Sequence, residues 1–320
     1  MSDIEKSIKE INSFGENLLD SSLAKYSSTV TTQAQASYNP HRHGCPVDFS
    51  FSVDPLSTKF YPHYDLKLVF HSYDFVFEQL NYENEDVYKQ AKTVRGYPHH
   101  LRSTLFIAND KLKELRRRDF MTVFMVGEEL KDKANKLYKE DKFYDALSMY
   151  NLIYSFYKWI EFKDKKRRDE IFNHITEIGK HPIVDDDVVI KTIKLNKKMQ
   201  NEKNSFNSAL TFLLKAMCYC YIHLRAYSEA VKCIDEAFEY ADDSLPDLYY
   251  RRAQARMYNK FSSIEDLRKA EKDLKAARQR KKGEQTIEDE YKKLIDMIKQ
   301  KEEKEITRIK SKFYIYKNKI

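Results

Sequence analysis

Apolar, small and charged residues follow a helical pattern between residues 129 and 150. The segment reads ELKDKANKLYKEDKFYDALSMY, and its apolar residues recur at the spacing of a helix with one buried face. Ala134 and Ala146 stand twelve positions apart, where two packed helices would have to touch. The pattern therefore predicts a short helix hairpin. Its apolar surface would come from Leu130, Leu137, Tyr138, Tyr144, Leu147 and Tyr150.

The same pattern returns twice further along the chain. A second hairpin is predicted over residues 207–240 and a third over residues 247–277. The small residue in the first helix of the third hairpin follows that of the second hairpin by 35 positions, which indicates an internal repeat. A longer loop displaces the second helix of the third hairpin. The small positions of these two hairpins are Cys218, Ala230, Ala253 and Ala270.

Two further segments complete the predicted helical domain. Residues 160–207 separate the first two hairpins, and this insertion is either a helical extension or a degenerate repeat. A long charged helix is predicted over residues 287–316, where it would cover the exposed face of the last hairpin. We therefore expect a helical domain over residues 126–283, followed by a capping helix and basic tail over residues 284–320.

The N-terminal third has a different pattern. Residues 1–20 predict one short amphipathic helix, and residues 21–100 predict an extended arm rich in proline, histidine and aromatic residues. Prolines at such short intervals exclude long helices. Within the arm, residues 65–77 alternate in the manner of a strand, although an isolated strand is only marginally stable. The arm would lie on its own helical domain or on another protein. Residues 101–125 predict a linking helix.

Composition narrows the class of protein. Charged residues make up 33% of the chain, and no apolar run approaches the twenty or so residues that span a bilayer, so we expect no membrane partner. The acidic N-terminus has no hydrophobic block typical of a secretory signal. The four cysteines form no disulfide framework, which fits a cytoplasmic protein. A net charge of +7 favours acidic protein surfaces and is too small to indicate nucleic acid binding.

The sequence carries no recognisable catalytic motif. It lacks a glycine-rich phosphate loop, a Gly-x-Ser-x-Gly turn and a His-Glu-x-x-His pair, so we expect neither an enzyme nor a cofactor. One alternative is a zinc site in the arm, because His41, His43 and Cys45 have ligand side chains. The remaining ligands would have to come from His63, His99 or His100, and roles in turns and packing fit these residues better. We expect no metal.

The three hairpins with their small positions and the long terminal helix resemble the tetratricopeptide repeat (TPR) family. The resemblance covers about residues 126–310, and within the family it is to the TPR domains of co-chaperones such as the large immunophilins. The resemblance implies an all-α solenoid of helical hairpins with a capping helix. It also implies that the domain binds other proteins and does not catalyse a reaction.

The resemblance also assigns candidate partner-binding residues. In such co-chaperones a Lys, an Asn, a second Asn, a second Lys and an Arg hold the carboxylates of a chaperone tail that ends in Glu-Glu-Val-Asp. The first Lys and Asn correspond to Lys131 and Asn135, one helical turn apart, and the Arg corresponds to Arg251. Lys215 would face the same groove at a neighbouring position.

Two of the five positions depart from that pattern. Ala216 replaces the second Asn, and Asp247 replaces the second Lys. Each lost charged hydrogen bond would weaken carboxylate binding by about 1.5–3 kcal/mol. Lys215 would compensate in part, so the groove would keep an excess of positive charge without the full set of donors.

Two functions follow from these observations. The first is a non-catalytic scaffold that joins a larger protein assembly through its groove and arm. An assembly of the cytoskeleton or cilium is an example, since tubulin surfaces are acidic and the residues after Ile306 are basic. The second is a co-chaperone that binds the acidic tail of a heat-shock chaperone through Lys131, Asn135, Lys215 and Arg251.

Overall fold

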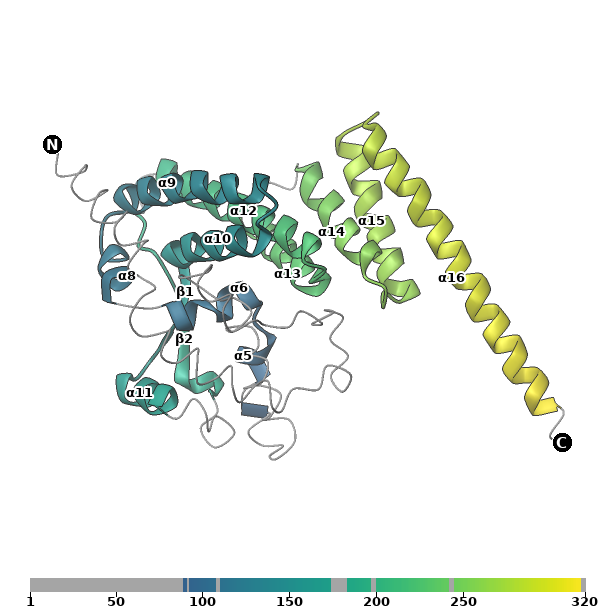
Figure 1. The fold of residues 1–320 in the computed structure, drawn as a ribbon, viewed down its shortest axis with the longest axis horizontal. Coiled ribbons are helices and arrows are strands. Elements are labelled where there is room, and N and C mark those ends of the chain that lie inside the picture. The colour runs from purple at the N-terminus through teal and green to yellow at the C-terminus, as the bar shows by residue number, and fades with distance from the viewer. Residues whose placement is uncertain are drawn as a thin grey trace.

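The structure is a computed structural model, and it describes most of the chain from residue 89 onward. The described residues are 89–90, 92–107, 110–173, 183–196, 200–241 and 245–317. The predicted helix over residues 1–20 and the arm up to residue 88 therefore lie outside the described residues. Within the described part the chain is mostly helical, as expected (Figure 1).

Three helix hairpins and a long final helix occupy the positions that the sequence predicts (Figure 1). Each hairpin pairs two consecutive helices, and α16 packs against α15 of the third hairpin. The bounds are α9 Phe120–Lys139 and α10 Phe143–Tyr157, α12 Gln200–His223 and α13 Tyr227–Ala237, α14 Pro246–Tyr258 and α15 Ile264–Arg280, and α16 Gln285–Lys317.

The small residues lie where the helices touch. All six are fully buried, namely Ala134, Ala146, Cys218, Ala230, Ala253 and Ala270. The first two hairpins also share their turn. Asp141 and Arg225 both adopt a left-handed backbone, with φ of 58° and 60°, and each lies seven residues after the small residue of its first helix. A left-handed residue is a frequent end of an α-helix.

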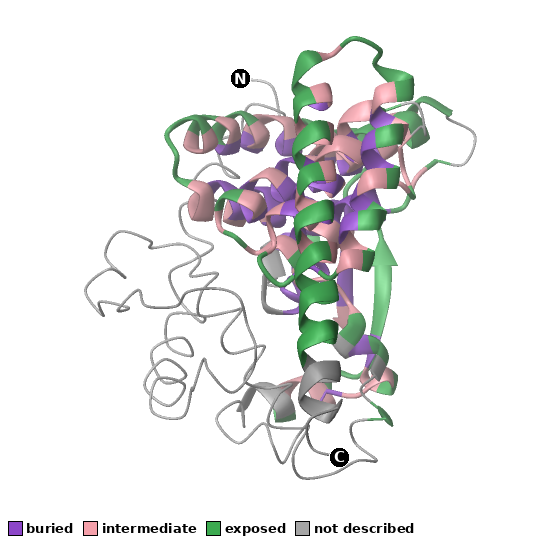
Figure 2. Cartoon of the chain, turned by 90° about the vertical axis from the view of Figure 1, so that its right-hand side faces the viewer, coloured by how far each residue is buried: buried purple, intermediate pink, exposed green. Residues whose placement is uncertain are grey.

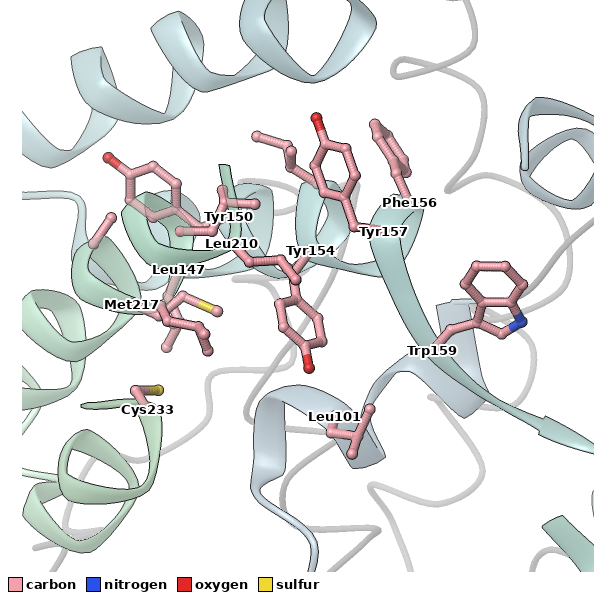
Figure 3. Close-up of a cluster of buried hydrophobic side chains, with 14 of the residues drawn as sticks. Leu101, Leu147, Tyr150, Tyr154, Phe156, Tyr157, Trp159, Leu210, Met217 and Cys233 are labelled. Carbon is pink, nitrogen blue, oxygen red and sulfur yellow. The ribbon is translucent and has the colours of Figure 1, made fainter. Parts of the chain in front are cut away.

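The buried side chains form two clusters. The larger one lies between α10, α12 and α13 and includes the tyrosines Tyr150, Tyr154 and Tyr157 of α10, with Leu101 and Met217 beside them (Figure 3). The smaller one joins α14, α15 and α16. Aromatic contact between α13 and α14 connects the two halves, because the rings of Phe238 and Tyr249 lie 4.7 Å apart.

The insertion contains a short β-hairpin within the otherwise helical fold. Strands β1 (Lys158–Phe162) and β2 (Val188–Thr192) pair antiparallel, with Lys158 opposite Thr192. Between them come α11 (Lys165–Asn173) and the 3-10 turn η3 (Asp185–Asp187). The described residues of the insertion begin with a strand directly after α10 ends at Tyr157, and residues 200–207 form the first turns of α12. The β-branched and aromatic residues of β1 and β2 favour strands.

The segment before α9 also differs from the prediction. In place of one linking helix over residues 101–125, short helices are separated by turns, and α9 itself already begins at Phe120 because Asp119 caps it. The residues before 101, assigned to the arm, include a helix that packs beside η3. The short helices are α5 Lys92–Gly96, α6 His99–Arg102, α7 Thr104–Ile107 and α8 Asp110–Leu115.

The exposure of the helices varies along the molecule. Figure 2 shows that α16 is exposed along most of its length, with buried positions only where it crosses the third hairpin. Ile287, Leu294 and Ile298 make that contact. None of the described helices has a stretch long and apolar enough to cross a membrane.

Candidate partner-binding face

The four predicted partner-binding residues come from the first helices of the three hairpins. Lys131 and Asn135 lie on α9, Lys215 on α12 and Arg251 on α14. Side-chain contacts link the three helices in this order, since Tyr138 and Tyr219 lie 6.4 Å apart and Tyr219 donates to a carboxylate of α14. We call this surface the first-helix face and define it by Lys131, Asn135, Tyr138, Lys215, Tyr219, Asp247 and Arg251.

On α9 both candidate residues already have partners. Lys131 forms an ion pair with Glu128, one turn earlier on the helix, and its Nζ lies 5.1 Å from the centre of the Phe212 ring. The Asn135 Oδ1 atom accepts a 2.7 Å hydrogen bond from the Tyr150 hydroxyl. The ion pair is half-exposed, so an incoming carboxylate could compete for Lys131, whereas Asn135 keeps its amide NH₂ for a partner.

On α12 and α14 the carboxylate of Asp247 stands between the two cations. Its Oδ2 lies 3.3 Å from the Lys215 Nζ and accepts a 2.7 Å hydrogen bond from the Tyr219 hydroxyl, while Oδ1 lies 3.7 Å from the Arg251 Nε. The Arg251 guanidinium also stacks 4.3 Å from the centre of the Tyr219 ring. Burial and the hydrogen bond to Asp247 raise the pKa of Tyr219. Asp247 therefore binds the two cations, Lys215 and Arg251, that a ligand carboxylate would need.

The expected excess of positive charge is largely neutralised within the face. Each of the three cations lies within ion-pair distance of a carboxylate, either Glu128 or Asp247. Ala216 is buried and offers no donor in place of the missing amide. One buried donor remains unsatisfied, because the Nε of Arg251 makes no hydrogen bond. The chemistry of the face is therefore aromatic rings interleaved with paired charges.

Aromatic side chains continue the face at both ends. Near α9 the imidazole of His223 stacks on Phe143 with 4.1 Å between ring centres, and Tyr138 meets His223 edge-on. Toward α16 the Tyr258 hydroxyl donates 2.6 Å to Glu290. Such rings give a large contact area at low conformational cost, and their hydroxyl groups can bond a peptide backbone.

A second polar cluster was not predicted from the sequence. Glu236 of α13 accepts hydrogen bonds from His100 Nε2 at 2.6 Å, from the Tyr154 hydroxyl at 2.6 Å and from Lys158 Nζ at 2.8 Å. Cys233 lies beside it, with its Sγ 3.4 Å from His100 Nδ1. We call these residues the Glu236 cluster. It joins α6, α10, β1 and α13 inside the larger core.

The Glu236 cluster places a thiol, an imidazole and a carboxylate in series, as nucleophilic enzymes do. Cys233 and His100 are fully buried, and burial raises the pKa of the Cys233 thiol, so the thiol is neutral and out of reach of a substrate. Glu236 is charged: burial would raise its pKa, but His100 and Lys158 outweigh that effect and hold it at about 2. The arrangement fits a structural ion cluster that fastens α6 to α13.

The histidines proposed as zinc ligands divide into two groups. His99 and His100 bind carboxylates, because the His99 backbone NH donates 2.9 Å to Glu229 and His100 binds Glu236. His41, His43, Cys45 and His63 lie outside the described residues. Within the described part of the chain, no three His, Cys, Asp or Glu side chains gather in a way that could hold a metal ion.

The basic run at residues 116–118 is partly internal. Arg116 is buried, donates 2.8 Å to the Ser155 carbonyl oxygen and stacks 4.3 Å from the centre of the Trp159 ring. Burial lowers the pKa of Arg116 to about 9. Arg118 pairs with Glu114 on the surface. Arg116 therefore anchors β1 and is not available to bind a phosphate or an acidic tail.

Comparison with known proteins adds no assignment, since no family model matches the chain and no curated protein matches it either.

Proposed function

We propose that the chain is a non-catalytic scaffold that joins a larger protein assembly through a TPR-like domain. The observation that carries the proposal is the first-helix face. Three hairpins with fully buried small residues hold α9, α12 and α14 in sequence, and their shared face combines tyrosines with half-exposed charges. Aromatic rings with polar tips are enriched at protein–protein interfaces.

The charge pattern of the face indicates which chemical groups a partner would present to it. Asp247 occupies the two cations of its half of the face, so a partner that supplies only a cluster of carboxylates must first compete with that residue. A partner segment with aromatic or amide groups meets no such competition, since Tyr138 and Tyr219 are partly exposed and Asn135 retains two donors. The proposal therefore favours an extended segment of another subunit over an isolated acidic tail.

The experiment compares two double variants of the tagged full chain in native purification followed by mass spectrometry. Lys131→Ala with Lys215→Ala changes the first-helix face, and Lys269→Ala with Lys275→Ala changes paired lysines on the outer helix α15. We expect a fixed set of companion proteins with the unmodified chain and with the α15 variant, and its loss with the face variant. An unchanged set in the face variant would refute binding through this surface.

The second candidate is a co-chaperone that binds the acidic tail of a heat-shock chaperone. The observation in its favour is that Lys131 and Asn135 of α9 and Arg251 of α14 come from helices linked through Tyr138 and Tyr219. Fluorescence anisotropy with a labelled peptide that ends in Glu-Glu-Val-Asp tests it. This candidate requires saturable binding that Lys131→Ala abolishes and that salt weakens. A flat titration with the unmodified chain excludes it.

An assembly of the cytoskeleton or cilium remains the example we propose for the scaffold. The end of α16 projects beyond the third hairpin (Figure 1). It exposes Arg308 and Lys310 beside Ile306 and Ile309. Cations with apolar neighbours suit an acidic protein surface, and the surface of tubulin is acidic. Co-sedimentation with microtubules at two salt concentrations tests this example. Absence of the chain from the pellet at low salt would remove it.

A further inference from the structure

The two edges of the β1–β2 hairpin differ in how they are covered. Backbone hydrogen bonds run from the Lys163 NH to the Asp187 carbonyl and from the Ile193 NH to the Tyr157 carbonyl. With the register, they determine which residues bond to the other strand, and we call these residues inward. By the alternation of an antiparallel pair, Ile160 of β1 then directs its backbone groups outward. Its NH donates 2.9 Å to the Thr104 side chain of α7. The outer edge of β1 is therefore closed by the molecule itself.

The outer edge of β2 has no such cover within the described residues. The same alternation points the backbone NH and C=O groups of Val188, Ile190 and Thr192 away from β1. The sheet has two strands in the described part of the chain, and no described residue bonds these outward groups. The hairpin thus presents three outward residues in the geometry of a strand-pairing site.

The side chains of β2 also favour a further strand. Its sequence is VVIKT, which is rich in β-branched residues, and Val189 and Ile190 are each 37% exposed. Apolar, uncovered edges tend to pair with other strands, and native proteins usually shield them. Lys191 is the one charge on β2, and it is already paired with Glu161 at 2.6 Å. The edge therefore lacks the free charge that discourages pairing.

Helix α5, which follows the arm in the sequence, lies beside the start of β2. The backbone NH groups of Thr93 and Val94, in α5, donate to the carboxylate of Asp185 at 3.0 and 2.8 Å. Asp185 begins the turn η3, which leads directly into β2. The first turn of α5 therefore lies close to the start of β2. The hydrogen bonds between α5 and Asp185 do not depend on the pairing of β1 with β2.

We propose that residues 65–77 of the arm add to β2 as a third strand of the sheet. Leu66, Leu68 and Phe70 stand at every second position, so one face of the added strand would be apolar. Fourteen residues separate Phe77 from Lys92, and they can span up to about 45 Å at ~3.3 Å per residue, which is ample to reach the edge. The isolated strand that the sequence indicates thereby gains a pairing partner.

The proposal does not rest on the proposed function. Pairing of residues 65–77 would fix the point from which residues 21–64 leave the helical domain, whichever partner the first-helix face binds. It assigns the site to this chain and not to a partner protein or a second copy.

Amide hydrogen exchange of the full chain, followed by NMR, tests the pairing. The outward NH groups of Val188, Ile190 and Thr192 should be protected as strongly as the inward NH groups of Val189 and Lys191. Without a third strand the outward groups would exchange close to the rate of an unstructured chain.

Two proline variants in the arm identify the occupant. Leu68→Pro removes a backbone donor and should lower the protection of the outward NH groups at least tenfold. Val30→Pro, in the Ser- and Thr-rich part of the arm, should leave it unchanged. Unprotected outward groups in the unmodified chain, protection that survives Leu68→Pro, or protection that rises with protein concentration would each overturn the proposal. The third result would indicate a second copy.

Discussion

Replacement of Glu236 by glutamine tests how much the Glu236 cluster stabilises the fold. The carboxylate accepts three hydrogen bonds from the side chains of His100, Tyr154 and Lys158, at 2.6–2.8 Å, and two of these donors can carry positive charge. Glutamine keeps the shape of the side chain but loses the charge and half of the acceptor capacity. The donors that lose a partner remain buried, which is the costly part of the change.

Two arguments give the magnitude. The pKa of Glu236 falls from 4.5 to about 2 on folding, which corresponds to about 3 kcal/mol at ~1.36 kcal/mol per pKa unit. Removal of one partner from a buried ion pair typically costs about 3–5 kcal/mol. We therefore expect Glu236→Gln to lower the free energy of unfolding by about 3 kcal/mol at pH 7.

The sign of the pH dependence follows from the direction of the shift. The folded-state pKa of Glu236 lies below the unfolded value, so its contribution is complete above the unfolded pKa and is lost as pH falls toward 2. By pH 3 roughly 2 kcal/mol of the contribution would be gone. The difference between the unmodified chain and Glu236→Gln should therefore shrink as pH falls from 5 to 3.

Urea denaturation at pH 7, 5 and 3 measures the loss of stability and its pH dependence. The shift of the midpoint urea concentration gives the change in stability when the slope of the free energy against urea is the same in both proteins. Glu239→Gln is the matched control, because the Glu239 Oε2 atom lies 3.8 Å from the Nζ atom of Lys158, but the Glu239 side chain is 63% exposed. A pair so exposed contributes about 0–1 kcal/mol. A cost below about 1 kcal/mol for Glu236→Gln, or a cost that is the same at pH 7 and pH 3, would refute the reasoning.

Three further substitutions test packing, ion pairing and capping by the same denaturation assay at pH 7. Gly127→Ala should cost about 1–3 kcal/mol, because the new Cβ would lie 2.5 Å from the hydroxyl of the fully packed Tyr157; a stabilised variant would contradict this packing. Asp273→Ala should cost about 3 kcal/mol, since this buried carboxylate binds two arginines of α14. The exposed Asp235→Ala should cost less than about 1 kcal/mol, and equal costs for the two would contradict the distinction. Ser263→Ala removes the N-cap of α15 and should cost about 1 kcal/mol, so an unchanged midpoint would contradict the capping role.

The hairpins were predictable because their signal is local. Small residues twelve positions apart mark the contact between the two helices of the first and second hairpins, and in the third hairpin Ala253 and Ala270 do so at a longer spacing. All six of these residues are fully buried. The long helix α16 was predictable for the same reason, as its apolar residues recur every three to four positions. The β-hairpin of the insertion was not predictable in this way. Strands β1 and β2 pair across more than twenty intervening residues, and each is only five residues long.

The electrostatics of the first-helix face were not predictable from the sequence. The sequence proposes Lys131, Lys215 and Arg251 as residues of one face. It does not reveal that Asp247 reaches back to Lys215 while it also approaches Arg251, because that geometry depends on the spacing of α12 and α14. The Glu236 cluster was beyond sequence reasoning, since His100 and Glu236 are 136 positions apart.

The Glu236 cluster shows that the helical domain with the first-helix face begins before residue 126, the predicted boundary. The sequence pattern assigned residues up to 100 to the arm, yet Val94 belongs to the larger core and His100 supplies a partner of Glu236. A domain that began at residue 126 would leave Glu236 buried without its imidazole partner, at a cost of several kcal/mol. The same α13 packs against α14, which carries Arg251 and Asp247. The helices α5 to α7 are therefore part of the structural support of the first-helix face.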